Sequence, residues 1–280
     1  MSTTLANCMI EMSKQMGDYW ASTTTSAGAA GGTSVVDTAL QAKLNDWITD
    51  ESHTRITSGT CDGQERYISS LDATNSTLTT LAHSAQIANG VSYEVHRIAT
   101  ASDKRIALIS AARDTFPHIH AFAGNSVNIS TDYSYYDITN YGFHRNTPHM
   151  VEYTTDPGST NPTWTTLHNW WVDSSNYLRW LPNQSFNGGA LRFRGIKTLQ
   201  FLLSNSESTN WSATIAIDTP QTDILVAQAI INVCKQYLQP NQESSTTDRW
   251  KEARDDWENE LRKAIRKHRM ATPPATVMWG

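Results

Sequence analysis

The sequence predicts an α+β fold, in which helices pack with a small antiparallel β barrel or sheet and with a second, β-sandwich-like unit. Three observations support this prediction. Apolar residues recur at helical spacing near both ends of the chain. Between these ends, short alternating segments are separated by Gly-, Asn- and Asp-containing turns. The length of 280 residues is enough to bury the cores of one or two domains.

The composition excludes several classes of protein. A net charge of −5 and a pI near 6.0 argue against nucleic-acid binding through overall charge. Cys8, Cys61 and Cys234 are widely separated and fit neither a disulfide framework nor a zinc-binding spacing, which favours a reducing compartment. The first residues lack the pattern of a signal peptide, and no segment reaches the ~20 apolar residues of a membrane helix. We therefore expect a soluble protein that is made inside the cell.

The N-terminal third predicts a helix followed by a β module. Residues 1–32 are expected to form an amphipathic helix over 3–17 and a Gly-, Ser- and Thr-rich entry segment over 21–32. Residues 33–98 predict the small antiparallel β module, because β-prone segments alternate with turns at 58–63 and 72–75. Its expected strands lie near 35–36, 52–57, 66–70, 77–81 and 91–98.

The middle of the chain predicts a connecting helix and a second β unit. Residues 99–120 contain the helix, with Ser102 as N-cap, Ile106 and Ile109 on its apolar face, and Pro117 ending it. Residues 121–217 predict the β-sandwich-like unit. Its clearest strands are 151–154, 177–181, 190–194 and 211–217.

The C-terminal region predicts two helices and an extended tail. Residues 218–270 form the expected helix pair, whose first helix starts at Asp218-Thr219-Pro220 and whose second opens near Thr246. The second helix has acidic residues in its first half and basic residues in its last turns, where the helix dipole favours positive charge. Residues 271–280 form the expected docking tail, because an apolar terminus after Pro273-Pro274 is better explained by a partner than by the chain's own fold.

Two motifs resemble chemical sites, and each has a simpler structural explanation. The spacing of Gly59, Cys61 and Gly63 matches a nucleophile elbow, but the following residues continue as a strand, which predicts a hairpin turn instead. Five histidines lie in one region without a recognisable zinc spacing, so surface histidines are the expected interpretation. These histidines are His118, His120, His144, His149 and His168. No catalytic set is recognised, and we expect no enzymatic activity, cofactor or metal.

Aromatic residues are concentrated in the second β unit. They could stack on sugar rings, or they could form the core or an interface. The residues are Trp164, Trp170, Trp171, Tyr177 and Trp180. Binding of a surface glycan through these rings is therefore an alternative function.

Several segments resemble a β module found in neck proteins of tailed bacteriophages. They are the segments 33–40, 57–66, 68–72 and 90–97. The helix from Asp103 to Pro117 is similar to the helix that joins this module to the rest of a neck protein. The stretch 223–230 resembles the start of the helix after their second β unit. The order of elements agrees over most of the chain, whereas the Tyr- and Trp-rich region 130–180 departs from the pattern.

The resemblance implies a head–tail adaptor. Such proteins form a ring, usually a dodecamer, between the portal protein and the tail or a second neck protein. Packaged DNA passes through this ring without sequence recognition, and no membrane is involved. The expected location is the head–tail junction of the virion, after assembly in the host cytoplasm. The alternative is a tail or baseplate protein that binds host surface glycan through the aromatic β unit.

Two sets of residues are predicted to contact these partners. Val277, Met278 and Trp279 are the expected docking residues for the portal, since aromatic side chains commonly anchor interfaces. Lys263, Arg266, Lys267 and Arg269 are expected to face the DNA channel, although charges at this end of a helix also complement its dipole.

Overall fold

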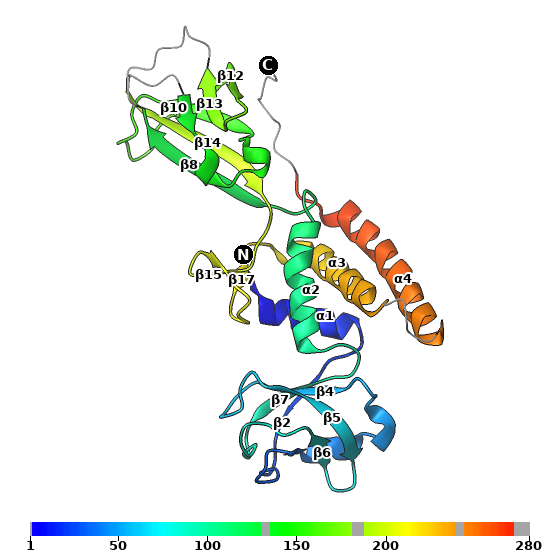
Figure 1. The fold of residues 1–280 in the computed structure, drawn as a ribbon. Coiled ribbons are helices and arrows are strands. Elements are labelled where there is room, and N and C mark those ends of the chain that lie inside the picture. The colour runs from blue at the N-terminus through cyan, green and yellow to red at the C-terminus, as the bar shows by residue number, and fades with distance from the viewer. Residues whose placement is uncertain (1, 130–134, 181–187, 239–243, 272–280) are drawn as a thin grey trace. The chain divides into compact units, whose positions relative to one another are not determined.

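The computed structural model describes residues 2–129, 135–180, 188–238 and 244–271 (Figure 1). The chain divides into two compact units. The first joins residues 1–114 to 201–267, and the second joins residues 115–200 to 268–280. The docking residues predicted at Val277, Met278 and Trp279 lie outside the described residues. The fold is α+β, as the sequence predicts.

The N-terminal β module is a curled antiparallel sheet of six strands in the order β2-β7-β4-β5-β6-β3 (Figure 1). One side of this sheet is apolar, and Val35, Ile68 and Val95 are buried in its core. Leu40, from the short helix η1 (Thr38–Ala42), joins the same core. The strands are β2 (Trp20–Thr23), β3 (Ser34–Val36), β4 (His53–Ile56), β5 (Glu65–Asp72), β6 (Thr77–Thr80) and β7 (Ser92–His96). A second short helix, η2 (Asn45–Trp47), precedes β4.

The two predicted turns join neighbouring strands of this sheet. Gly59 and Gly63 adopt positive φ angles of 76° and 80° between β4 and β5, a conformation that suits glycine. Between β5 and β6, the Asn75 N–H donates to Asp72 Oδ1 at 3.0 Å. The local chemistry of these residues therefore sets the hairpin positions.

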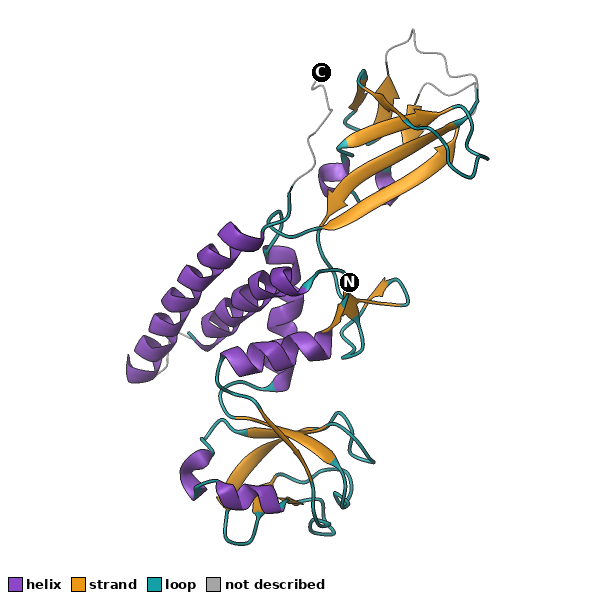
Figure 2. Cartoon of the chain, turned by 180° about the vertical axis from the view of Figure 1, so that it is seen from behind, coloured by secondary structure: helices purple, strands orange, loops and turns teal. Residues whose placement is uncertain are grey.

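The helices of the first unit pack against one another, with α2 in contact with both α1 and α3 (Figure 2). Their bounds are α1 (Leu5–Gln15), α2 (Ala101–Asp114), α3 (Thr219–Tyr237) and α4 (Ser244–His268). At the start of α1, Thr4 Oγ1 accepts the Asn7 N–H at 3.1 Å. Gly17 has φ +67° just after this helix, where a glycine commonly ends a helix.

Helix α2 differs from the sequence prediction in both its cap and its buried face. Thr100, rather than Ser102, caps it, because Thr100 Oγ1 accepts the Asp103 N–H at 3.0 Å. Lys104 is fully buried, whereas Ile106, predicted on the apolar face, is 58% exposed. Helical periodicity predicted the wrong buried face for α2, because it treats a lysine as a surface residue.

Helix α4 begins at Ser244, two residues before the predicted opening. Along 247–268, Trp250 is the one buried residue, and its ring stacks on Tyr237 with centroids 4.8 Å apart. Trp257 and Leu261 are only partly buried. The helix is therefore anchored mainly near its N-terminal end.

The segment 201–217 belongs to the first unit rather than to the predicted second β unit. Most of the predicted strand 211–217 is not a strand, because only Thr214–Ile215 forms one, β17, which pairs with β1 (Thr3–Thr4). The carbonyl of Ala213 accepts the Leu5 N–H at 2.8 Å and thus satisfies a backbone donor at the start of α1. The same small sheet includes β15 (Leu202–Leu203) and β16 (Ser206–Glu207).

The predicted Gly-, Ser- and Thr-rich entry segment is partly a strand, because Trp20–Thr23 forms β2, which pairs with β7. The β module therefore starts near residue 20 rather than at 33. Glycine- and threonine-rich composition predicted a flexible connection, but pairing with a distant strand orders these residues.

The second unit contains two antiparallel sheets, ordered β11-β10-β14-β8 and β12-β13-β9 (Figure 1). Residues from both sheets, including Phe193 and Trp170, share one core. The strands are β8 (Ala121–Asn128), β9 (Tyr135–Asp137), β10 (Met150–Thr154), β11 (Thr165–Leu167), β12 (Trp170–Val172), β13 (Tyr177–Trp180) and β14 (Ala190–Lys197). Short helices η3 (Thr139–Tyr141) and η4 (His144–Asn146) connect β9 to β10.

Candidate functional site

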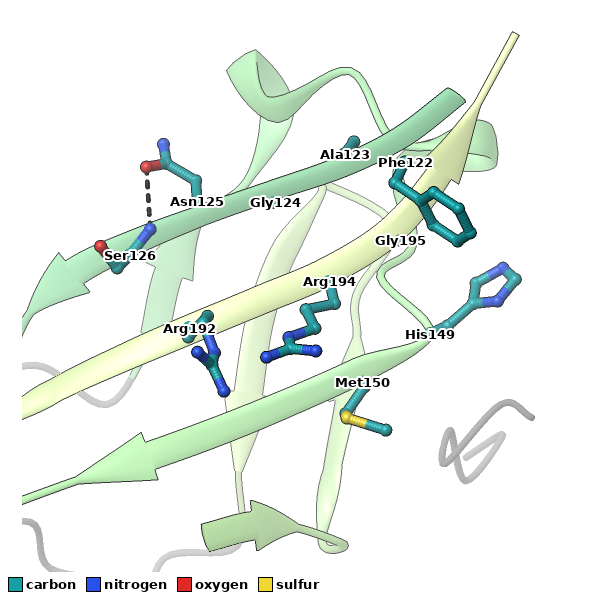
Figure 3. Close-up of a pocket in the computed structure, with 10 residues that line it drawn as sticks. All are labelled: Phe122, Ala123, Gly124, Asn125, Ser126, His149, Met150, Arg192, Arg194 and Gly195. Atoms are coloured by element: carbon teal, nitrogen blue, oxygen red, sulfur yellow. Dashed lines mark hydrogen bonds between the residues drawn. The ribbon is translucent and has the colours of Figure 1, made fainter. Parts of the chain in front are cut away.

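A groove of about 580 Å³ lies on the solvent side of the second unit's larger sheet (Figure 3). It is lined by residues of β8, β14 and β10 and by His149, which precedes β10. Alternation along β14 explains its chemistry, because Leu191 and Phe193 point into the core while Arg192 and Arg194 lie on the opposite face. Gly124 contributes no side chain to the groove. The groove therefore has open space above β8, and the positive charges of its arginines lie above β14.

Both arginines form ion pairs with the same carboxylate, that of Glu152. Glu152 receives two hydrogen bonds from Arg192, at 2.8 and 3.0 Å, and its Oε2 lies 2.9 Å from Arg194 Nε. The guanidinium of Arg192 also lies over the Trp164 ring, 4.2 Å from its centroid. The side chain of Arg194 remains 54% exposed. Two cations share one anion, so the groove is suited to a further carboxylate or another anion.

A second cluster of ionisable groups is buried in the first unit. Lys104 Nζ lies 2.5 Å from Asp18 Oδ2 and 2.9 Å from Ser13 Oγ, and it also contacts His96 Nδ1 at 3.0 Å. Asp18 further accepts the backbone N–H groups of residues 97 and 98. These contacts connect α1 and α2 to the end of β7.

The buried chain of charges continues into the β module. His96 Nε2 lies 3.4 Å from Glu94 Oε2, which in turn accepts a hydrogen bond from Arg55 at 2.8 Å. Burial lowers the pKa of His96, an effect that the charge of Lys104 reinforces and Glu94 opposes. Burial also lowers the pKa of Lys104, whereas Asp18 acts in the opposite direction. Because these groups are enclosed and mutually paired, we interpret the cluster as structural.

All four predicted channel residues are exposed, and three of them lie on one helix. These three are Lys263, Arg266 and Lys267, on the last turns of α4, whereas Arg269 lies just beyond the end of the helix. Lys263 Nζ pairs with Glu260 at 2.7 Å within the same helix. Their exposure is compatible both with a solvated helix end and with contact to a polyanion.

The candidate histidines do not assemble into a metal centre. His120 is buried with its Nδ1 3.2 Å from the Pro117 carbonyl, and the His144 ring packs on Phe116 at 4.3 Å. Within the described ranges, no group of three or more His, Cys, Asp or Glu side chains is arranged to hold a metal ion.

The aromatic cluster divides between the core and the surface. Trp170 and Trp180 are 1% and 7% exposed and belong to the shared core. Trp164, Trp171 and Tyr177 are partly exposed, and Trp164 covers Arg192. A sugar-stacking surface therefore does not include the two buried tryptophans.

Cys61 lies in the predicted turn and is 2% exposed, with its Sγ 3.4 Å from the Ala85 carbonyl oxygen. The chain after it leads directly into strand β5 rather than into a helix. The local structure is thus the hairpin turn that the sequence predicts, and it lacks the helix that a nucleophile elbow requires.

Sequence reasoning did not identify the groove. The alternation Arg192-Phe193-Arg194 is a signal that the two arginines share one face of a strand. No comparable signal in the sequence shows that Glu152 lies opposite Arg192, because these residues are 40 positions apart and meet only through the pairing of β10 with β14.

The chain matches no protein-family model, and no curated protein matches it at a significant level. No helix among the described residues combines the length and apolar character needed to cross a membrane.

Proposed function

We propose that this chain is a structural virion protein of a tailed bacteriophage, a head–tail adaptor that forms a ring between portal and tail. One observation supports the proposal most directly. The segments that resemble the neck-protein module lie together in the six-stranded sheet, mainly in β3, β5 and β7 and in the turn before β5. Helix α2 follows this sheet and packs against α3, which contains the stretch 223–230.

The proposed role is one of assembly rather than catalysis. The portal protein, a tail or second neck protein and further copies of the chain are the proposed partners, and the head–tail junction is the proposed location. DNA would pass through the ring without recognition of its sequence. The exposed basic end of α4 supports a place beside DNA phosphates, because three of its cations lie within five residues of one helix.

Immunogold electron microscopy of the phage that encodes the chain tests this location. An antibody raised against the purified chain is expected to label the joint between head and tail. The same antibody absorbed with purified chain serves as the control. Specific label at the distal tail tip, or virions that contain no detectable chain, would contradict the adaptor proposal.

Portal binding tests the proposed docking tail. We expect the chain lacking residues 271–280 to keep its circular-dichroism spectrum and melting temperature but to lose co-sedimentation with purified portal rings. A charge-reversed variant at Lys263, Arg266 and Lys267 is the matched comparison, and it should still bind the portal because those residues are assigned to DNA. Retained binding by the truncated chain would refute the role of the tail.

A further inference from the structure

Strand β8 forms one edge of the larger sheet in the second unit. Its pairing with β14 runs from Ala121 opposite Lys197 to Asn128 opposite Ala190, and no other described strand pairs with it. Its eight residues, Ala-Phe-Ala-Gly-Asn-Ser-Val-Asn, include no charged residue and no proline. Natural sheets usually protect a long edge with such residues or by shortening the strand. The opposite edge is short, since β11 has three residues.

The hydrogen bonds around β8 show which backbone groups face away from β14. Just after the strand, the Ile129 N–H donates to the Gly189 carbonyl at 2.9 Å, so odd-numbered residues face the paired side. The Ser126 N–H instead donates to Asn125 Oδ1 at 2.8 Å, and the Asn128 carbonyl accepts the Tyr136 hydroxyl at 3.4 Å. The backbone N–H and C=O groups of Phe122 and Gly124 therefore point away from β14.

The groove runs along this free edge (Figure 3). Side chains of even-numbered β8 residues lie on the same face as Arg192 and Arg194, which are on the solvent side of the sheet. Phe122 is 64% exposed there, and Gly124 leaves space beside it. A strand added to the edge would thus place every second side chain over the groove.

Charge determines what kind of strand fits. Arg192 and Arg194 face the single carboxylate of Glu152, which leaves one positive charge in excess. Arg194 is the more exposed of the two, with 54% of its side chain accessible against 27% for Arg192. A second copy pairing through the same edge would bring two more arginines to this face, which disfavours self-association.

We propose that the free edge of β8 binds an extended acidic segment of another protein by strand addition. Backbone groups of the segment pair with Phe122, Gly124 and Ser126, and the Ser126 N–H exchanges its hydrogen bond to Asn125 Oδ1 for one to the segment. One carboxylate of the segment binds Arg194. An apolar side chain two positions away packs on Phe122. This surface is independent of the adaptor proposal, since it involves neither the basic end of α4 nor the C-terminal tail.

Peptide binding to the full-length chain tests the proposal. The probe is a fluorescent peptide, Glu-Thr-Val-Thr-Glu-Thr-Val, in which a Val lies two positions from each Glu and therefore on the same face of the strand. Its binding is measured by anisotropy, and the comparison peptide has Lys in place of each Glu. We expect the acidic peptide to bind and the basic peptide to bind at least about tenfold more weakly. Equal binding of both peptides, or no binding of the acidic one at about 1 mM, would refute the proposal.

Two pairs of variants separate the backbone and charge contributions. Ser126→Pro removes an N–H that already faces away from β14, so we expect a folded protein that binds the acidic peptide about tenfold more weakly. Ser126→Ala keeps this N–H and should bind the peptide with unchanged affinity.

Arg194→Gln should weaken acidic-peptide binding several-fold. Arg145→Gln removes the same charge from an exposed residue outside the groove and should not weaken binding. Unchanged binding by Arg194→Gln would overturn the assignment of the carboxylate.

Hydrogen exchange on the unmodified chain provides a readout that does not depend on a variant folding. Saturation with the acidic peptide should slow exchange of the Phe122 and Gly124 amides, because they become donors to the added strand. Binding without added protection in 122–126 would show that the peptide lies elsewhere.

Discussion

Replacing Lys104 with methionine tests the interpretation of the buried charge cluster. In the folded chain Lys104 is fully buried and contacts Asp18, Ser13 and His96 within 3.0 Å. Methionine has a similar length but no charge, so the substitution leaves the carboxylate of Asp18 buried without its cation. Asp18 is itself 1% exposed, and water therefore has little access to it.

The expected cost follows from what remains around Asp18. Removing one partner of a buried ion pair typically costs ~3–5 kcal/mol. The carboxylate keeps hydrogen bonds from the backbone N–H groups of residues 97 and 98, which still favour its charged form. We therefore expect a loss of ~3 kcal/mol, at the lower end of this range.

Urea denaturation followed by circular dichroism at 222 nm measures this loss in the relevant unit, because all four described α-helices lie almost entirely in the first unit. Lys14→Met is the matched control, since Lys14 is 56% exposed and lies 4.0 Å from Glu11. We expect this control to change the free energy of unfolding by ~0.5 kcal/mol or less. A cost below about 1 kcal/mol for Lys104→Met would refute the structural role of the ion pair.

Two further predictions concern acid stability and helix docking. Burial, together with the charge of Arg66, lowers the pKa of His83 from 6.5 to about 4, and burial lowers that of His96 as well. The unfolded chain then binds protons below about pH 6.5 that the folded chain does not bind. Stability should therefore fall as the pH drops from about 6.5 to 4, by ~1 kcal/mol per pH unit for His83, and the lowered pKa of His96 acts in the same direction. Melting temperature should depend less steeply on pH in the His83→Gln variant than in the unmodified chain, whereas the exposed His168→Gln control should keep the original slope. Identical slopes in all three proteins would show that His83 does not cause the loss of stability in acid. For Trp250→Ala, the loss of stacking on Tyr237 should cost ~3 kcal/mol and release α4. Hydrogen exchange should then rise along 247–268 but not in α2, and unchanged protection of α4 would contradict its anchoring role.

Much of the fold could be predicted because its signals are local. The turns at 58–63 and 72–75 depend on residues that favour turn conformations, and the positive φ of Gly59 and Gly63 follows from this chemistry. The apolar spacing of Leu5, Met9 and Met12 likewise predicts the buried face of α1. In each case a few neighbouring residues contain the whole signal.

The errors arise where residues far apart in the chain decide the structure. Trp20–Thr23 is a strand because β7 pairs with it, although its surrounding composition predicts a flexible segment. Lys104 is buried because Asp18, 86 positions away, neutralises it, and this reverses the expected face of α2. Neither pairing can be seen in a local window of sequence.

The fold class, the turns and the alternation that puts Arg192 and Arg194 on one face can all be read from the sequence. The position of Glu152 between these arginines, and of β8 at an edge of the sheet, is visible only in the folded chain. Local conformation depends on neighbouring residues, whereas strand order and ion pairing depend on which distant segments meet. The candidate site belongs to this second group, and the free edge along Phe122 and Gly124 is its clearest feature.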